Sequence, residues 1–151
     1  MLGRIRITAN GFRVAQQRIV KRTFGVLACA PSGNTTNIVN VLRSNWDDDS
    51  GSSFQPNIVA AYDPANGVTA INNAIIVNEL NNDRPLLYCN THHAMVVVAA
   101  DYFNTPMGPN VQAVGVLDPY PGIPDFHPLT MVEMTPSLMG GQMTFLAAVH
   151  V

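Results

Sequence analysis

The sequence feature that most constrains the fold is a run of small and β-branched apolar residues, Cys89 to Tyr102, which opens on two adjacent histidines. We expect Val96 to Val98 to form a buried strand, because three successive β-branched residues suit a pleated surface and crowd a helix. With a period of two, one face of that strand carries His93, Met95 and Val97, and the other carries His92, Ala94, Val96 and Val98. A histidine at the mouth of an apolar strand is costly to bury unless its ring nitrogens find partners. Elsewhere in the chain, Cys29 and Asp118 are candidate partners.

The charge content restricts the kinds of partner. The 151 residues are 47% apolar and 12% charged, so we expect one domain, residues 1–151, whose core needs no disulfide or metal. Eight Lys and Arg residues are too few for a surface that follows nucleic-acid phosphates, so no nucleic acid is expected as a partner. Six of the eight lie between Arg4 and Arg22, where we favour a solvated surface over a tether for an acidic partner.

No apolar run reaches the roughly 18 residues that a membrane-spanning helix requires, and we expect no membrane span. The first six residues lack the apolar core of a signal peptide, which is consistent with a cytoplasmic protein, a mature form after cleavage, or export without such a signal. Two cysteines are too few for a disulfide framework. Cys89 is therefore interpreted as a buried thiol, with a resolving thiol or a bridge to Cys29 as alternatives.

The first half of the chain contains two helical patterns. Pro31 suits the first turn of a helix that continues through the amphipathic segment 38–43, which would put Cys29 at or just before the helix N-terminus, although Gly33 and Asn34 could delay the start. A thiolate in that position is stabilised by free N–H groups and the helix dipole. Residues 68–82 carry a second pattern near helical spacing, which stops before Pro85.

The second half is typical of antiparallel strands. Residues 86–88 begin a strand that leads to the histidines, 106–109 form a hairpin loop, 111–117 form the returning strand, and a stiff turn follows from Asp118 to Gly122. Residues 129–134 and 144–151 predict two final strands. Helices followed by antiparallel strands indicate an α+β fold.

Along the sequence, Cys29, His93 and Asp118 occur in the order of a nucleophile, a general base and a residue that orients the base. A thiol is a weak nucleophile until it is deprotonated, an imidazole can take its proton, and a carboxylate can orient the imidazole and favour its charged form. Cys29 before a helix, and His93 and Asp118 on neighbouring strands, could converge in space to supply these three functions.

These residues resemble a known family. Cys29 before a helix, Arg-Pro-Leu-Leu at 84–87, His-Ala-Met-Val-Val-Val at 93–98 and Val-Leu-Asp-Pro-Tyr-Pro-Gly at 116–122 are similar to papain-like cysteine peptidases. The nearest branch is the bacterial one that includes the peptidases trimming double-glycine leader sequences. The resemblance covers about residues 14 to 122 and implies a papain-like fold, in which N-terminal helices pack on an antiparallel β-sheet.

The resemblance implies a peptidase or related amide hydrolase that forms an acyl-enzyme on a peptide or protein substrate, without a cofactor. By position, Cys29 is the nucleophile, His93 the base and Asp118 the orienting residue, and Gln17 or Gln16 contributes to the oxyanion hole. Two alternatives remain open. One is an inactive papain-like module that binds a peptide or protein partner, and the other is an acyltransferase that uses the same three residues.

Several other features are interpreted as structural. Residues 47–55 begin with three aspartates but lack the alternating ligand spacing of a calcium loop, so we favour a solvated loop. A zinc site at His92 is disfavoured because adjacent histidines on a strand point to opposite faces. Accordingly, no metal site is expected. His127 and His150 show no partner pattern, Met131, Met134, Met139 and Met143 are interpreted as core filling, and Gly140-Gly141 as a turn rather than a self-processing site.

Overall fold

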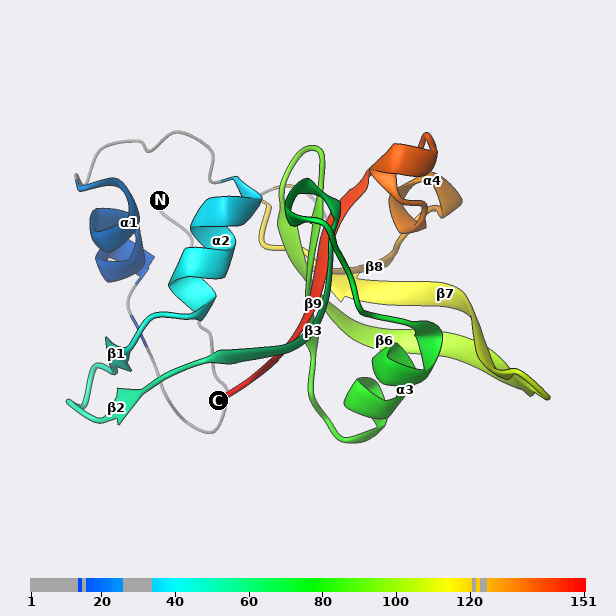
Figure 1. Ribbon diagram of the computed structural model, residues 1–151, viewed down its shortest axis with the longest axis horizontal. Coiled ribbons are helices and arrows are strands. Elements are labelled where there is room, and N and C mark those ends of the chain that lie inside the picture. The colour runs from blue at the N-terminus through cyan, green and yellow to red at the C-terminus, as the bar shows by residue number, and fades with distance from the viewer. Residues whose placement is uncertain (1–13, 15, 26–33, 121, 123–124) are drawn as a thin grey trace. The chain divides into compact units, whose positions relative to one another are not determined.

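The structure, a computed structural model, describes residues 14, 16–25, 34–120, 122 and 125–151 (Figure 1). The chain divides into two compact units: an N-terminal unit, which ends at Ile58 and includes His150 and Val151, and a sheet unit, Val59–Val149. The architecture is mixed α+β, with a few helices and a large antiparallel sheet, as the order of the patterns predicts. Within the described residues, no helix is both long and apolar enough to cross a membrane.

The N-terminal unit contains α1 (Gln16–Phe24), α2 (Thr35–Leu42), β1 (Trp46–Asp47) and β2 (Ser53–Phe54). Helix α2 includes most of the predicted amphipathic segment, but it begins later than Pro31. Asn34 and Asn37 form a reciprocal capping box, in which each side chain accepts the other's backbone N–H. This pair supplies hydrogen bonds to N–H groups that a helix start leaves unsatisfied, so the helix begins directly after Asn34. Pro31 is therefore not in its first turn.

The sheet unit is built on seven strands in the spatial order β4–β3–β9–β5–β6–β7–β8. The strands are β3 (Asn57–Asp63), β4 (Val68–Thr69), β5 (Leu86–Asn90), β6 (Ala94–Thr105), β7 (Gly108–Leu117), β8 (Phe126–Pro128) and β9 (Met143–His150). The other elements are the α-helices α3 (Asn73–Asn81) and α4 (Met131–Met134), and the 3₁₀ helices η1 (Pro64–Asn66) and η2 (Ser137–Met139). Helix α3 packs against β5, β6 and β7. The long β6–β7 hairpin turns at the predicted loop and projects from the rest of the sheet (Figure 1).

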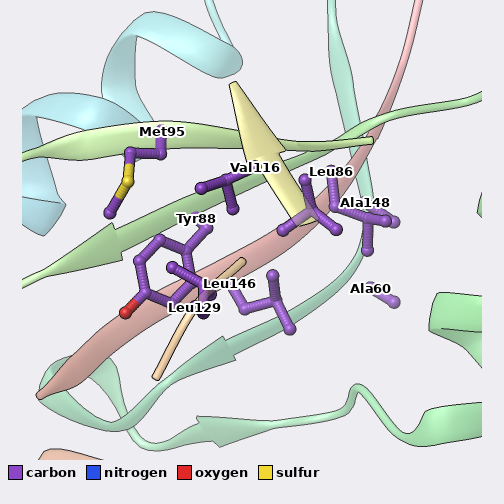
Figure 2. Packing of buried hydrophobic residues seen from close by; sticks show 9 residues of the cluster. Ala60, Leu86, Tyr88, Met95, Val116, Leu129, Leu146 and Ala148 are labelled. Carbon is purple, nitrogen blue, oxygen red and sulfur yellow. The ribbon is translucent and has the colours of Figure 1, made fainter. Parts of the chain in front are cut away.

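The core of the sheet unit follows the predicted alternation. Met95 and Val97 are 1% and 2% exposed and share one face, as the alternation predicts. Val98 is 37% exposed, so the buried strand that we expected from Val96 to Val98 is confirmed at Val97 and wrong at Val98. Leu86 and Tyr88 on β5 pair with Val97 and Met95 on β6, and they join the same cluster of buried side chains (Figure 2). On β5 and β9, the opposite face of the sheet is buried as well, at Cys89, Phe145 and Ala147.

Two predicted elements are wrong in type or extent. The helix expected over residues 68–82 starts only at Asn73, because Val68 and Thr69 pair with Asp63 and Tyr62 across the β3–β4 hairpin. Residues 129–134 do not form the strand that we expected, because Met131–Met134 is the helix α4. Here Thr130 and Glu133 form a capping box, and the signal Thr-x-x-Glu is visible in the sequence.

The methionines are only partly core residues. Met131 and Met139 are 70% and 77% exposed, so core filling is wrong for these two. Met134 and Met143 are partly buried against the core cluster. All four line one cavity of about 630 Å³ in the sheet unit, whose wall also includes residues of α3, β6 and β7. The Gly140-Gly141 pair follows η2, where Gly140 adopts φ +84°, and it forms the turn that we expected.

Candidate functional site

A tight turn between β5 and β6 positions the two adjacent histidines. Asn90 is 7% exposed, and its side-chain oxygen accepts the backbone N–H groups of His92 at 2.8 Å and His93 at 2.9 Å. The Asn90 N–H in turn donates to the His93 carbonyl at 3.1 Å. Asparagine commonly closes turns through such bonds to the backbone that follows it. Placing both histidines on a continuous strand is therefore wrong, and the period-two pattern applies only from Ala94 onward.

The structure brings His93 and Asp118 together. His93 Nε2 lies 2.8 Å from Asp118 Oδ2, across 25 positions of sequence. The Asp118 side chain is 1% exposed and that of His93 is 25% exposed, so the carboxylate is buried while the ring reaches the surface. A hydrogen bond to a buried carboxylate is stronger and more directional than one in water.

The backbone after β7 holds Asp118 in place. Its N–H donates to the Asp125 carbonyl at 2.8 Å, and its Oδ1 accepts the N–H of Tyr120 at 2.8 Å. The Tyr120 ring lies 5.5 Å from the His93 ring at an interplanar angle of 42°. One carboxylate oxygen is thus occupied by the backbone, and the other is directed at His93.

This arrangement determines which nitrogen of His93 is available for chemistry. A carboxylate can only accept hydrogen bonds, so Nε2 carries the hydrogen that lies between the two groups. In the neutral ring, Nδ1 is then the nitrogen with the free lone pair. The pair can therefore act as an oriented general base through Nδ1, with Asp118 stabilising the imidazolium that forms.

The remaining predicted site residues lie in the N-terminal unit. Gln16 and Gln17 are in the first turn of α1. Cys29 lies outside the described residues, and five positions separate it from Asn34, the capping residue of α2. The convergence of Cys29 and Gln17 with His93 therefore stays a prediction.

The second cysteine is a buried, free thiol. Cys89 lies on β5 with 5% exposure, and it forms no disulfide. Burial raises the pKa of Cys89 to about 12. The thiolate is the reactive form of cysteine, so Cys89 is unreactive near neutral pH. The structure agrees with the interpretation of Cys89 as a buried residue.

Sequence reasoning missed a third side chain at this site. His127 Nε2 lies 4.0 Å from Asp118 Oδ2, and the His127 side chain is 22% exposed. His127 is on β8, which pairs with β7 after a turn rich in proline and glycine. That turn was recognised in the sequence, but the returning strand is only three residues long, which is too short for an alternating pattern to be recognised.

The polar segment after β1 is closed by internal hydrogen bonds. Asp48 is 8% exposed, and Oδ1 accepts the N–H groups of Ser50 at 2.9 Å and Ser52 at 2.7 Å. The Ser50 hydroxyl and these N–H groups hold the pKa of Asp48 below its ordinary value. The solvated loop that we expected is confirmed at Asp47 and Asp49, which are exposed, and wrong at Asp48. Among the residues that the structure describes, no group of three or more His, Cys, Asp or Glu side chains is arranged to hold a metal ion.

No model of a known protein family matches the chain, and neither the curated proteins nor the solved structures contain a match. The function of this chain must therefore be inferred from the side chains that the fold brings together. Among these, the buried Asp118 and the oriented His93 form the arrangement with the most specific chemistry.

Proposed function

We propose that the chain is a papain-like cysteine peptidase or a related amide hydrolase. Cys29 is the nucleophile, His93 the general base and Asp118 the residue that orients it. One observation carries the proposal: His93 Nε2 contacts the buried Asp118 carboxylate at 2.8 Å, which leaves Nδ1 as the basic nitrogen. The order of the three residues in the sequence supports it as well.

In the proposed reaction, His93 Nδ1 removes the proton from the Cys29 thiol, and the thiolate adds to the carbonyl carbon of an amide. The carbonyl oxygen becomes an oxyanion, which the Cys29 backbone N–H and the Gln17 side chain stabilise. As the C–N bond breaks, the amine leaves with the proton from His93, and a thioester remains on the sulfur. Water, deprotonated by His93, hydrolyses the thioester and releases the carboxylic acid.

Alkylation with iodoacetamide at pH 6 tests the nucleophile. An ordinary cysteine has a pKa near 8.5, so only about 0.3% of it is thiolate at pH 6. If an imidazolium at His93 stabilises the Cys29 thiolate, Cys29 reacts at least tenfold faster than a free thiol, as measured by peptide mass spectrometry. Cys89 is an internal reference, because burial raises its pKa to about 12. Alkylation of Cys29 no faster than that of a free thiol would remove the main support for an enzyme.

The two adjacent histidines supply a matched pair of variants. His93→Ala should lower the rate of Cys29 alkylation at pH 6, and any amide hydrolysis, by at least about 10²-fold, as expected for loss of a general base. His92→Ala should leave most of both rates, because His92 is exposed in the same turn. Asp118→Asn keeps the shape of the site and should give a partial loss. The opposite result, an inactive His92→Ala and an active His93→Ala, would show that the site is assigned to the wrong histidine.

A further inference from the structure

Two imidazole rings share one carboxylate oxygen at this site. Asp118 Oδ1 is occupied by the Tyr120 N–H, so Oδ2 is the atom that faces the rings. His93 Nε2 lies 2.8 Å from Oδ2, and His127 Nε2 lies 4.0 Å from it. The His93 contact is a hydrogen bond, whereas the His127 distance is too long for one and acts through charge.

Strand pairing fixes this three-residue cluster. His127 on β8 is the cross-strand partner of Val116 on β7, so the two side chains share one face of the sheet. Asp118 follows Val116 by two positions, and its N–H continues the pairing to the Asp125 carbonyl. The proximity of His127 to Asp118 is thus built into the register of the β7–β8 pair.

One carboxylate can compensate one imidazolium. The two Nε2 atoms are about 7 Å apart at most, because they lie 2.8 and 4.0 Å from the same oxygen. This separation is below the screening length of about 8 Å at physiological ionic strength. A proton on one ring therefore repels a proton on the other through a site whose carboxylate is 1% exposed.

We propose that His127 is a positioning residue for His93: it acts through Asp118, and its protonated form competes with the His93 imidazolium for the same carboxylate oxygen. The catalytic meaning of this competition rests on the proposed function. As the pH falls and His127 becomes charged, His93 holds its own proton less strongly. His127 then makes the general base weaker in acid than a neutral residue at the same place would.

Other titratable groups surround the cluster and are unchanged in the test. Tyr120 follows Asp118 in the chain and contacts the His93 ring. Asp125 lies directly before β8 and is exposed. His92 is next to His93 in the β5–β6 turn and is exposed. These three groups are present both in the wild type and in variants at position 127, so their effect on His93 is common to the chains compared.

The test follows the imidazole resonances of the full chain by NMR between pH 4 and 9. The chain contains four histidines, which single substitutions can assign. In His127→Gln, the titration curve of His93 should move to higher pH by about 0.5 to 1.5 units, the range expected for two charges at this separation in a half-buried site. In His93→Gln, the curve of His127 should move to higher pH by the same amount, because coupling between two binding sites is reciprocal.

His92→Gln is the matched control and should move neither curve by more than the experimental error. The inference is overturned if neither titration curve moves, that is, if the His93 curve is unchanged in His127→Gln and the His127 curve is unchanged in His93→Gln. The two variants lie on different elements, so the coupling can be measured in either one if the other does not fold. Shifts of unequal size would show that structural change, and not a shared carboxylate, moves the curves.

The NMR readout does not involve Cys29, which separates this inference from the proposed function. Reciprocal shifts together with an unreactive Cys29 would support the shared carboxylate and contradict the peptidase. Where Cys29 is reactive, the pH profile of its alkylation adds a second readout. His127→Gln and the wild type should then agree at pH 8 and differ about twofold or more at pH 5.5, because the competition requires a charged imidazolium at position 127. Identical profiles would contradict a positioning role for His127.

Discussion

The hydroxyl of Tyr88 joins the central strand β5 to α4, and the size of the destabilisation caused by its removal depends on pH. Tyr88 is 1% exposed within the core cluster (Figure 2). Its hydroxyl donates to the Glu133 carbonyl at 2.8 Å. Tyr88→Phe keeps the ring and deletes this donor. A hydrogen bond of this kind contributes about 1 kcal/mol net, and Glu133 is half-buried, so water can reach its carbonyl in the variant. We therefore expect a loss of about 1 kcal/mol in the free energy of unfolding at pH 7.

The pH dependence follows from the raised pKa of Tyr88. Burial, and then the charges of Glu133 and Cys89, raise the pKa of the Tyr88 phenol well above its ordinary value of 10.0. When the pKa of a group is higher in the folded chain than in the unfolded chain, its contribution to stability is complete at pH values below the unfolded-state pKa. The contribution is lost as the pH rises through the folded-state pKa. Between these two pKa values, the unfolded chain releases the Tyr88 proton and the folded chain does not, which lowers the free energy of unfolding of the wild type by about 1.4 kcal/mol for each pH unit above 10.

Phenylalanine has no proton to release, so the difference between wild type and Tyr88→Phe should shrink above pH 10 and reach about zero near pH 11. Urea unfolding followed by circular dichroism at pH 7, 9 and 11 measures this difference. Tyr102→Phe, at a residue that is 39% exposed, is the control and should stay within about 0.5 kcal/mol of the wild type at pH 7. A difference for Tyr88→Phe that is the same at pH 7 and pH 11 would refute the reasoning.

Two further substitutions test the local structure around α4, with urea unfolding as the measurement. A Cβ at Gly141 would overlap the Thr135 carbonyl, so Gly141→Ala should lower stability by about 3 kcal/mol. In the control Gly115→Ala, the new methyl meets the edge of the exposed, movable Phe126 ring at 2.7 Å and the Ala99 Cβ at 3.3 Å, but no backbone atom, so the loss should be under about 1 kcal/mol. Equal losses for the two variants would contradict the overlap at Gly141. Thr130→Ala removes the capping box with Glu133 and should cost about 1 kcal/mol, and an unchanged stability would show that the cap is dispensable.

Local residue patterns were sufficient for much of the sheet unit. The alternation of apolar residues after the histidines placed Met95 and Val97 on one face of a strand, and both are buried on that strand. Proline and glycine marked the β6–β7 turn, and the strand before Asp118 was recognised from its apolar residues. These features depend on neighbours one to four positions away, and a sequence displays such neighbours directly.

The order of chemically active residues also had predictive value at the candidate site. His93 and Asp118 were expected on neighbouring strands, and their side chains are 2.8 Å apart. Their role in catalysis, and that of Cys29 and Gln17, stays a prediction. The position of His93 in a turn was not expected, because it depends on the Asn90 side chain, which accepts two backbone N–H groups in place of strand pairing.

Tertiary structure decided the features that depend on distant partners. His127 lies near Asp118 because β8, a strand of only three residues, pairs with β7 in one register. The sequence predicts a buried Cys89, but the raised pKa of its thiol follows from the desolvation that the paired strands around β5 produce. Local sequence determines the conformations that a segment favours, but the distance between two side chains and their exposure to water depend on which strands pair, and pairing is a property of the whole sheet.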